Sequence, residues 1–249
     1  MGLQTEIRDI DYNEFVSLLG TAHFTKRSVR EACESVERLK PTDLAIELDL
    51  QRFNVLNGVC ASCPKRLECD RKCEFVGATD ALGNTDANIW LIDMSEYEIA
   101  IRIRSATHPF SSGGWGYITY ADLPFFYDDS DDSDNEEEDE ASLWERGYKE
   151  RVLDANQRRL ELLRRRAPAV WRVLIDERNA LMAARLAWIV SKSLDEGRKP
   201  KILAVVGAAH VNGIRELLAN PSAIKESMRR LGLTFKPPTL IRRVRINGD

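Results

Sequence analysis

The sequence predicts an α/β protein with a mostly parallel sheet flanked by helices on both faces. Short apolar runs, each ending near a glycine or a polar residue, alternate along the chain with longer segments whose apolar residues recur every three to four positions. A chain of 249 residues is also long enough to form the core of one such domain. We therefore expect a single α/β domain over residues 1–249.

The first strand–helix–strand unit lies near the N-terminus. Residues 16–19 form an apolar run that ends at Gly20, which is typical of a buried strand. A helix follows, because Thr25 can cap its first turn and apolar residues recur at helical spacing until Pro41. Residues 44–48 predict a second strand, parallel to the first and reached by a right-handed connection.

The middle of the chain contains a third strand and a long helix. Residues 89–92 are an apolar run that ends at Asp93, and residues 111–116 are rich in glycine and serine and predict a loop. Helix returns at 142–166, where Ser-Leu-Trp-Glu matches a capping box. The arginine clusters of this region lie beside Glu161 and lack interleaved aromatic residues, so a solvated helix face is the simpler interpretation and phosphate binding is the alternative.

The last third of the chain completes the alternation. A helix is predicted over residues 168–197, since proline suits its first turn and glycine its end. Residues 201–206 are the clearest buried strand in the chain. Helices are expected after His210 and at Pro221, and residues 240–244 predict a final strand.

Two segments interrupt this pattern. Residues 54–75 contain four of the five cysteines and read as a small insertion. Residues 128–140 contain ten acidic side chains in thirteen positions and no apolar one, which predicts a disordered loop. A solvated spacer is the simpler interpretation of this acidic loop, and an interaction segment is the alternative.

Composition excludes several classes of protein. Lys and Arg number 36 and Asp and Glu 40, so the formal net charge is -4 and nothing indicates a nucleic-acid-binding protein. No run approaches the roughly 18 apolar residues that cross a bilayer, and the N-terminus lacks the features of a secretory signal. We expect a cytoplasmic protein with no membrane segment and no nucleic-acid partner. The sequence leaves open whether the protein forms a homo-oligomer.

Two of the three histidines stand in the same local frame. Each follows an apolar run, a glycine and two small residues, in Gly-Thr-Ala-His ending at His23 and Gly-Ala-Ala-His ending at His210. Glycine allows a sharp turn off a strand, and parallel sheets bind ligands where their strands end. A single such histidine is more often a hydrogen-bonded structural residue, but the matched pair favours a site at the carboxyl edge of the sheet.

Glu47 can join the two histidines. It lies near the end of the strand predicted at 44–48, and its neighbours in that strand are apolar. A carboxylate buried among them without a functional role would cost free energy. Two imidazoles and a carboxylate can bind a divalent ion and leave positions for water and substrate. A surface carboxylate at a strand end is the alternative interpretation of Glu47.

Charged residues also interrupt the helix predicted over 168–197. Asp-Glu-Arg-Asn occupies positions 176–179 of an otherwise apolar helix, and either Arg178 or Glu177 can point towards the sheet edge. Arginine could there bind a substrate carboxylate or stabilise developing negative charge. An ordinary polar helix face fits the spacing equally well.

Four of these segments, in this order, resemble the signatures of the TraB pheromone-shutdown family. They are Leu-Leu-Gly-Thr-Ala-His ending at His23, Ala-Ile-Glu-Leu-Asp at 45–49, Asp-Glu-Arg-Asn at 176–179, and Val-Val-Gly-Ala-Ala-His ending at His210. Residues 91–102 are also similar to that family, although Met94 stands where the family often has arginine. The resemblance runs from residue 16 to about residue 220.

The TraB family is related to the Tiki proteins, which are metal-dependent proteases, and more distantly to erythromycin esterases. The resemblance therefore implies metal-dependent hydrolysis of a peptide or a small ester, with Mn²⁺, Co²⁺ or Zn²⁺ bound by His23, His210 and Glu47. It implies an orienting role for Asn179. The candidate catalytic residues are His23, Glu47, Arg178, His210, Asn179 and Glu177.

The cysteine cluster predicts a second metal site. Cys60, Cys63, Cys69 and Cys73 place four thiols within fourteen residues, which suits Zn²⁺ or an iron–sulfur cluster. Disulfides and plain thiols are the alternatives. Cys33 lies on the apolar face of a predicted helix and reads as core.

Three functional hypotheses follow from the sequence. The first is a metal-dependent hydrolase that activates water at the His/His/Glu site. The second is a ligand-binding or regulatory protein that uses the same sheet edge without turnover. The third is a metal or redox sensor in which the cysteine segment is the working part.

Overall fold

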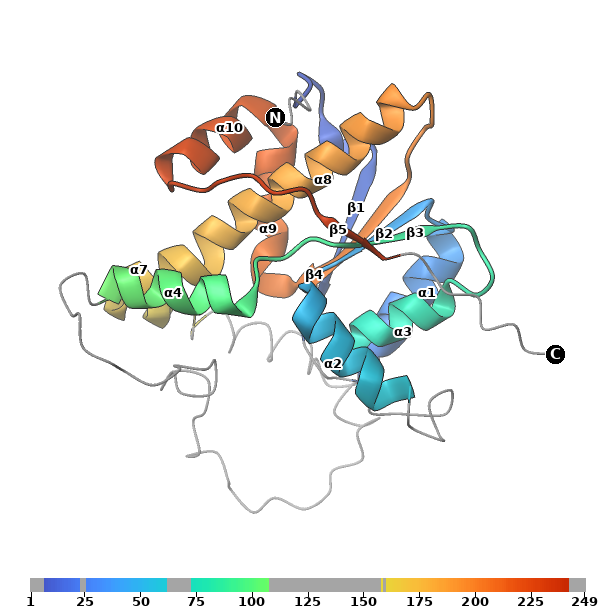
Figure 1. Cartoon of the computed structure of the whole chain (residues 1–249), viewed down its shortest axis with the longest axis horizontal. Helices are drawn as coiled ribbons and strands as arrows, with labels where there is room; N and C mark the ends of the chain where they lie inside the picture. The colour runs from blue at the N-terminus through green and yellow to red at the C-terminus, as the bar shows by residue number, and fades with distance from the viewer. Residues whose placement is uncertain (1–6, 23–25, 62–72, 108–157, 159, 242–249) are drawn as a thin grey trace, which may run out of the picture. The chain divides into compact units, whose positions relative to one another are not determined.

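The structure of the protein is a computed structural model in which most of the chain can be described. The described residues are 7–22, 26–61, 73–107, 158 and 160–241. The chain forms two compact units, one made of residues 1–96 and 175–249 and the other of residues 97–174. The first unit contains the sheet (Figure 1).

The described part of the first unit contains a five-stranded sheet in the order β1-β4-β2-β3-β5. Strands β1, β4, β2 and β3 are parallel, and β5 pairs with β3 in the antiparallel sense. The strand bounds are β1 (Val16–Thr21), β2 (Asp43–Ile46), β3 (Asn88–Leu91), β4 (Ile202–Gly207) and β5 (Thr239–Ile241). This arrangement confirms the predicted α/β fold with a mostly parallel sheet.

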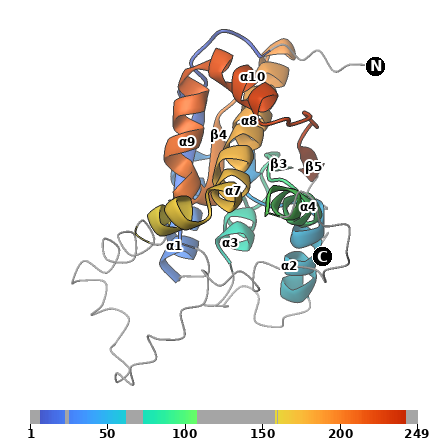
Figure 2. The ribbon, with the colours of Figure 1, turned by 90° about the vertical axis from the view of Figure 1, so that its left-hand side faces the viewer.

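The helices of the first unit form two groups. The first comprises α1 and α3, which lie side by side, and the second comprises α8, α9 and α10 (Figures 1 and 2). α2 follows β2 directly, and the short 3₁₀ helix η1 precedes β1. The bounds are η1 (Tyr12–Glu14), α1 (Lys26–Leu39), α2 (Leu50–Ala61), α3 (Glu74–Ala81), α8 (Arg178–Asp195), α9 (Ala208–Ala219) and α10 (Pro221–Arg230).

Both faces of the sheet are buried because side chains alternate along each strand. On one face, Leu44, Leu91 and Val205 pack with residues of α1 and α3 in one hydrophobic cluster. On the other face, the ring of Trp90 meets that of Trp188 from α8 edge to face, with centroids 5.9 Å apart. Helices therefore cover the two faces, as parallel sheets require.

The second unit is helical where it is described. It contains α4 (Glu96–Thr107), helical residues 160–166, α7 (Pro168–Trp171) and the start of η5 (Arg172–Glu177). We predicted one helix over residues 168–197, but a π-helical segment, η5, separates α7 from α8. A π turn inserts an extra residue per turn and so rotates the side chains that follow, and it ends immediately before Arg178.

Some predicted boundaries shift by a few residues. β2 ends at Ile46, so Glu47 lies just beyond the strand, and α9 begins at Ala208, so His210 lies in its first turn. Both shifts have the same cause, because the chain turns away from the sheet at the residue where the hydrogen bonds between neighbouring strands end. β5 is described only over Thr239–Ile241, whereas we predicted residues 240–244.

Several predicted features lie outside the described residues. They are the cap at Thr25, the loop at 111–116, the acidic loop at 128–140, the start of the helix at 142–166, and residues 62–72 of the cysteine segment. α2 continues to Ala61 and α3 begins at Glu74, so helices flank that segment.

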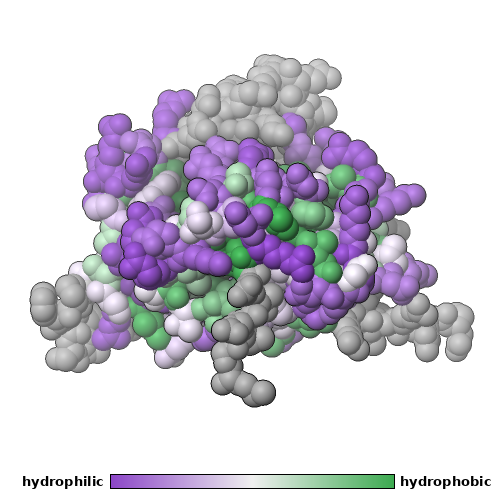
Figure 3. Space-filling view, turned by 90° about the horizontal axis from the view of Figure 1, so that it is seen from above, coloured by the Kyte–Doolittle hydropathy of each residue, from purple (hydrophilic) through white to green (hydrophobic). Residues whose placement is uncertain are grey.

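The described surface is mostly polar on the face seen in Figure 3, where hydrophilic residues surround smaller hydrophobic areas. Isolated hydrophobic residues on a surface are ordinary and mark no binding site by themselves. Each helix in the described ranges is too short or too polar to span a bilayer.

The close approach of β1 to α9 generates a first prediction. A Cβ on Gly20 would lie 2.7 Å from Val211 Cγ2 and 3.1 Å from Ala208 Cα, whereas a Cβ on Gly58 would meet nothing within 4 Å. We expect Gly20→Ala to lower the free energy of unfolding by about 1 to 3 kcal/mol. The matched Gly58→Ala should be neutral or stabilising by up to about 1 kcal/mol. Urea denaturation of both variants tests this, and equal stabilities would contradict the close packing.

Candidate functional site

The candidate site lies where β1, β4 and β2 end. In the parallel register, Gly20 is aligned with Val206 and Thr21 with Gly207, so the two Gly-x-x-His turns begin on adjacent strands. β2 lies on the other side of β4, and the Glu47 N–H donates to the Val205 carbonyl 3.1 Å away. The carboxyl edge therefore brings Glu47 next to the turn that leads to His210, as the sequence predicted.

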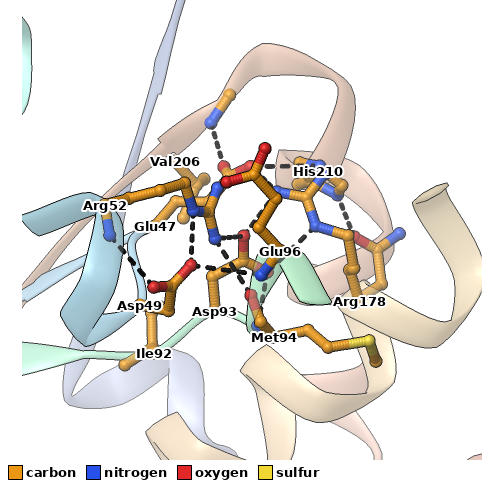
Figure 4. A network of polar contacts seen from close by, with 12 residues as sticks. Glu47, Asp49, Arg52, Ile92, Asp93, Met94, Glu96, Arg178, Val206 and His210 are labelled. Atoms are coloured by element: carbon orange, nitrogen blue, oxygen red, sulfur yellow. Dashed lines mark hydrogen bonds and ion pairs between the residues drawn. The ribbon is translucent and has the colours of Figure 1, made fainter. Parts of the chain in front are cut away.

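Glu47 is buried and its two carboxylate oxygens have different partners. The Gly207 N–H donates to Oε2, while Arg178 Nη2 donates to Oε1. Arg178 also donates from Nε and Nη2 to the two carboxylate oxygens of Asp93, at 2.9 and 2.7 Å (Figure 4). One guanidinium thus joins the carboxylates that follow β2 and β3, and this pairing offsets the cost of burying both.

His210 faces Glu47 from the first turn of α9. Its Nε2 lies 3.3 Å from Glu47 Oε1, and its Nδ1 lies 2.7 Å from Asn179 Oδ1. An amide oxygen can only accept, so Nδ1 carries the proton and donates to Asn179. In the neutral imidazole, Nε2 then has a lone pair directed towards the carboxylate.

A second arginine strengthens the carboxylate network. Arg52, near the start of α2, donates to Asp93 Oδ2 at 2.7 Å and to the Met94 carbonyl at 2.9 Å. It also pairs with Asp49, whose carboxylate accepts the Gln51 and Arg52 backbone N–H groups and so caps α2. The network therefore spans the ends of β2 and β3 and the start of α2.

The electrostatics of this network favour the charged forms of its two aspartates. Burial raises the pKa of Asp93, but the charges of Arg178 and Arg52 outweigh it and lower that pKa below its usual value. The pKa of Asp49 is also lowered, because the hydrogen bonds and charge of Arg52 outweigh the effect of burial. Burial by itself would lower the pKa of Arg52, and the two aspartates raise it.

Arg185 secures the end of β3 from α8. Its Nη1 donates to the carbonyls of Ile92 and Asp93, and its Nε donates to the Lys236 carbonyl at 3.0 Å. The carbonyls of Ile92 and Asp93 lie just past β3, and a buried carbonyl beyond the end of a strand needs a donor from elsewhere in the protein. Arg185 therefore holds the backbone at Asp93, while Arg178 and Arg52 hold its carboxylate.

Comparison with known proteins supports the family resemblance over part of the chain. A model of the TraB/PrgY/gumN family matches residues 123–224, a range that includes Arg178, Asn179 and His210. This match covers less than half of the chain and shows a similarity to the TraB/PrgY/gumN family over that range. It is also 26% identical over 226 residues to the uncharacterized protein MJ1365 of Methanocaldococcus jannaschii. That alignment covers 80% of this chain and 52% of the relative, so the chain spans about half the relative's length.

In the structure, four of the predicted site residues come together. Glu47, Arg178, Asn179 and His210 are all buried and joined by the contacts above. Glu177 is buried immediately before Arg178, and a catalytic role for it stays a prediction. His23 lies outside the described residues, two positions beyond Thr21.

Sequence reasoning missed Asp93, Asp49 and Arg52 as site residues. Asp93 gave the same signal as Glu47, since it is a carboxylate at the end of an apolar run, but we used it only to mark the end of a strand. Its side chain is fully buried. Met94, where the family often has arginine, is also fully buried, and its N–H donates to Asp93 Oδ1.

The donors of the predicted metal sites are described only in part. Among the described residues, no group of three His, Cys, Asp or Glu side chains could hold an ion. His210 Nε2 and Glu47 Oε1 provide two donors, and a third would have to come from elsewhere. In the cysteine cluster, Cys73 is buried at the start of α3, and the side chains of Cys60, Cys63 and Cys69 lie outside the description.

The lowered pKa of Asp93 predicts how stability depends on pH. The folded state keeps Asp93 ionised below pH about 4, where the unfolded chain takes up a proton, so stability falls as the pH drops below about 4. Asp93→Asn should lower stability at pH 7, because Arg178 and Arg52 lose a partner, and should flatten this acid dependence. Urea midpoints between pH 7 and pH 3 measure both effects. The exposed Asp9→Asn is the control, and an unchanged acid slope in Asp93→Asn would contradict the assignment.

The packing of Asn179 predicts a role for Gly213, one turn after His210. A Cβ on Gly213 would lie 2.3 Å from Asn179 Nδ2 and 3.1 Å from its Cγ, so the amide that holds His210 would have to move. We expect Gly213→Ala to cost about 1 to 3 kcal/mol of stability. In an Asn179→Ala background the same change should cost much less, because no amide remains to be displaced. Thermal denaturation of the four proteins tests this, and additive costs would contradict it.

Proposed function

We propose that the protein is a hydrolase of peptide or small ester bonds, in which His210, Glu47 and His23 bind a divalent metal ion. The observation that supports this most directly is the pair formed by His210 Nε2 and Glu47 Oε1. If Nδ1 donates to Asn179, two lone-pair donors face each other at 3.3 Å. Such a pair is favourable when a proton or a metal ion lies between the two atoms.

The separation of these atoms fits a metal ion. Imidazole nitrogen and carboxylate oxygen bind Zn²⁺ at about 2.0 to 2.2 Å, so two ligands of a tetrahedral ion lie roughly 3.3 to 3.6 Å apart. The bond from Nδ1 to Asn179 is also the kind of contact that fixes the orientation of a metal-binding histidine. The third donor in this proposal is His23, because its turn leaves the strand adjacent to β4.

A bound ion would supply a water molecule of lowered pKa as the nucleophile. The residues of the chain supply the rest of the proposed site. Asn179 holds the imidazole in one tautomer, and Gly207 and Arg178 orient Glu47. Arg178, which already contacts two carboxylates, is our candidate for stabilising negative charge that develops on the substrate.

A second candidate function is ligand binding without turnover. The observation that favours it is the pairing already present in the site, since both oxygens of Glu47 and several donors of Arg178 contact other protein groups. A site of this kind could recognise a small anion or a peptide that leaves unchanged. For the cysteine cluster, we propose that Cys60, Cys63, Cys69 and Cys73 bind zinc or an iron–sulfur cluster, either as a structural centre or as a sensor.

Mn²⁺ binding tests the hydrolase proposal separately from the cysteines, because Mn²⁺ prefers oxygen and imidazole ligands to thiolates. The chain has three histidines, so His23→Ala, His108→Ala and His210→Ala form a complete set. We expect calorimetry to show that the first and third changes weaken Mn²⁺ binding at least about tenfold, and that His108→Ala does not. Hydrolysis of a peptide library and of aryl esters should require the metal and disappear in His210→Ala.

Two outcomes would overturn the proposal. Wild-type protein stripped by chelator that takes up no Mn²⁺, Co²⁺ or Zn²⁺ would remove the metal site. Metal-loaded protein that binds a peptide or an ester and returns it unchanged would favour the ligand-binding function instead.

A further inference from the structure

Thr21, the last residue of β1, makes two contacts at the edge of the candidate site. Its Oγ1 lies 3.0 Å from Glu74 Oε1 and 3.3 Å from the Val206 carbonyl oxygen. Both are acceptors, so the single hydroxyl proton lies between them. Thr21 therefore bridges the first turn of α3 and the end of β4.

Glu74 is a buried carboxylate that the proposed reaction has not used. Glu74 is fully inaccessible to solvent, although it is the first residue of α3. It lies 53 positions from Thr21 along the chain. The N-terminus of a helix favours negative charge, which makes this position tolerable for a carboxylate. A buried charge is nevertheless costly unless its partners are fixed, so Glu74 and Thr21 constrain each other.

The two buried glutamates act on the same peptide group. The carbonyl of Val206 accepts from Thr21, which Glu74 contacts, and the N–H of Gly207, in the same peptide group, donates to Glu47. A peptide group is planar, so fixing its oxygen and its nitrogen fixes its orientation. This peptide leads directly into the Gly-Ala-Ala-His turn, and its orientation sets the direction in which His210 leaves the sheet.

We infer that Glu74 is a positioning residue of the site, acting through Thr21 to fix the Val206–Gly207 peptide that orients both Glu47 and His210. The consequence for metal binding rests on the proposed function, but the effect on the peptide does not. Glu74 thereby extends the site to α3, on the opposite side of the Val206–Gly207 peptide from Glu47.

Amide hydrogen exchange at Gly207 tests the inference without a metal. Thr21→Val removes the bridging hydroxyl at nearly constant volume, and we expect it to raise the exchange rate of the Gly207 amide about tenfold. Thr21→Ser should restore the wild-type rate. Thr79→Val is the matched control, because its hydroxyl bonds the Phe75 carbonyl at 2.8 Å within α3 and should leave Gly207 unaffected. Wild-type exchange in Thr21→Val would overturn the inference.

A double-mutant cycle assigns the effect to the pair. Glu74→Ala, Thr21→Val and the double variant should raise Gly207 exchange to a similar extent, because in the inference the Thr21 hydroxyl fixes the Val206 carbonyl only while Glu74 holds that hydroxyl in place. Effects that add in the double variant would show that Glu74 and Thr21 act separately, and would overturn the inference.

Mn²⁺ affinity then links the bridge to the site. With an intact metal site, Thr21→Val should weaken Mn²⁺ binding about 10- to 100-fold while Thr21→Ser and Thr79→Val bind as wild type. If the wild type binds no Mn²⁺, the proposed function fails while the exchange data still decide the role of Glu74. If the wild type binds Mn²⁺ and Thr21→Val binds it equally well, the positioning role is wrong and the proposed function stands.

Discussion

The buried charge of Glu47 is the constraint on which the candidate site depends. Its side chain is 3% exposed and lies at the end of β2, the central strand of the sheet. A carboxylate can be ionised there only if fixed donors surround it, and the structure provides the Gly207 N–H and Arg178. These donors come from the β4–α9 turn and from α8, so satisfying one charge draws three parts of the chain together.

The same requirement extends outwards from Glu47. Arg178 is itself buried and is balanced by Asp93, and Asp93 in turn is shared with Arg52, which Asp49 orients. Three carboxylates and three nearby arginines, including Arg185 on the β3 carbonyls, form a connected network. Removing one member of a buried pair typically costs about 3 to 5 kcal/mol because it leaves the other charge unpaired. With all pairs intact, much of the attraction between these charges is offset by the cost of removing them from water. The main effect of the network is therefore to fix the positions of Glu47 and His210 rather than to raise the net stability of the fold.

The sequence predicted the fold and part of this site for one reason. The spacing of apolar residues indicates which side chains are buried, so the runs at 16–19 and 201–206 predicted β1 and β4, and the glycines after them predicted the turns. This spacing does not indicate which polar groups contact one another across the sheet. Asp93 and Arg52 are separated by 41 positions and no local pattern links the two, so their pairing emerged only from the strand order.

The π-helical segment η5 was also beyond sequence reasoning, and it affects the site. The apolar spacing of residues 168–197 fits one uninterrupted helix, whereas the structure inserts η5 immediately before Arg178. Helical periodicity left the direction of Arg178 undecided for this reason. Asn179, assigned from family resemblance alone, lies against His210, and the space that Gly213 leaves open explains how its amide fits there.

The protonation of His210 tests the central claim most directly, because the site requires an imidazole whose Nε2 lone pair faces Glu47. Nitrogen-15 spectra of histidine-labelled protein resolve three imidazoles and distinguish the two ring nitrogens of each. We predict that Nδ1 of His210 carries a proton, which it donates to Asn179, and that an added metal ion changes the resonance of Nε2 and leaves the Nδ1 proton in place. A His210 ring with no proton on Nδ1, or a metal ion bound at Nδ1, would contradict the account.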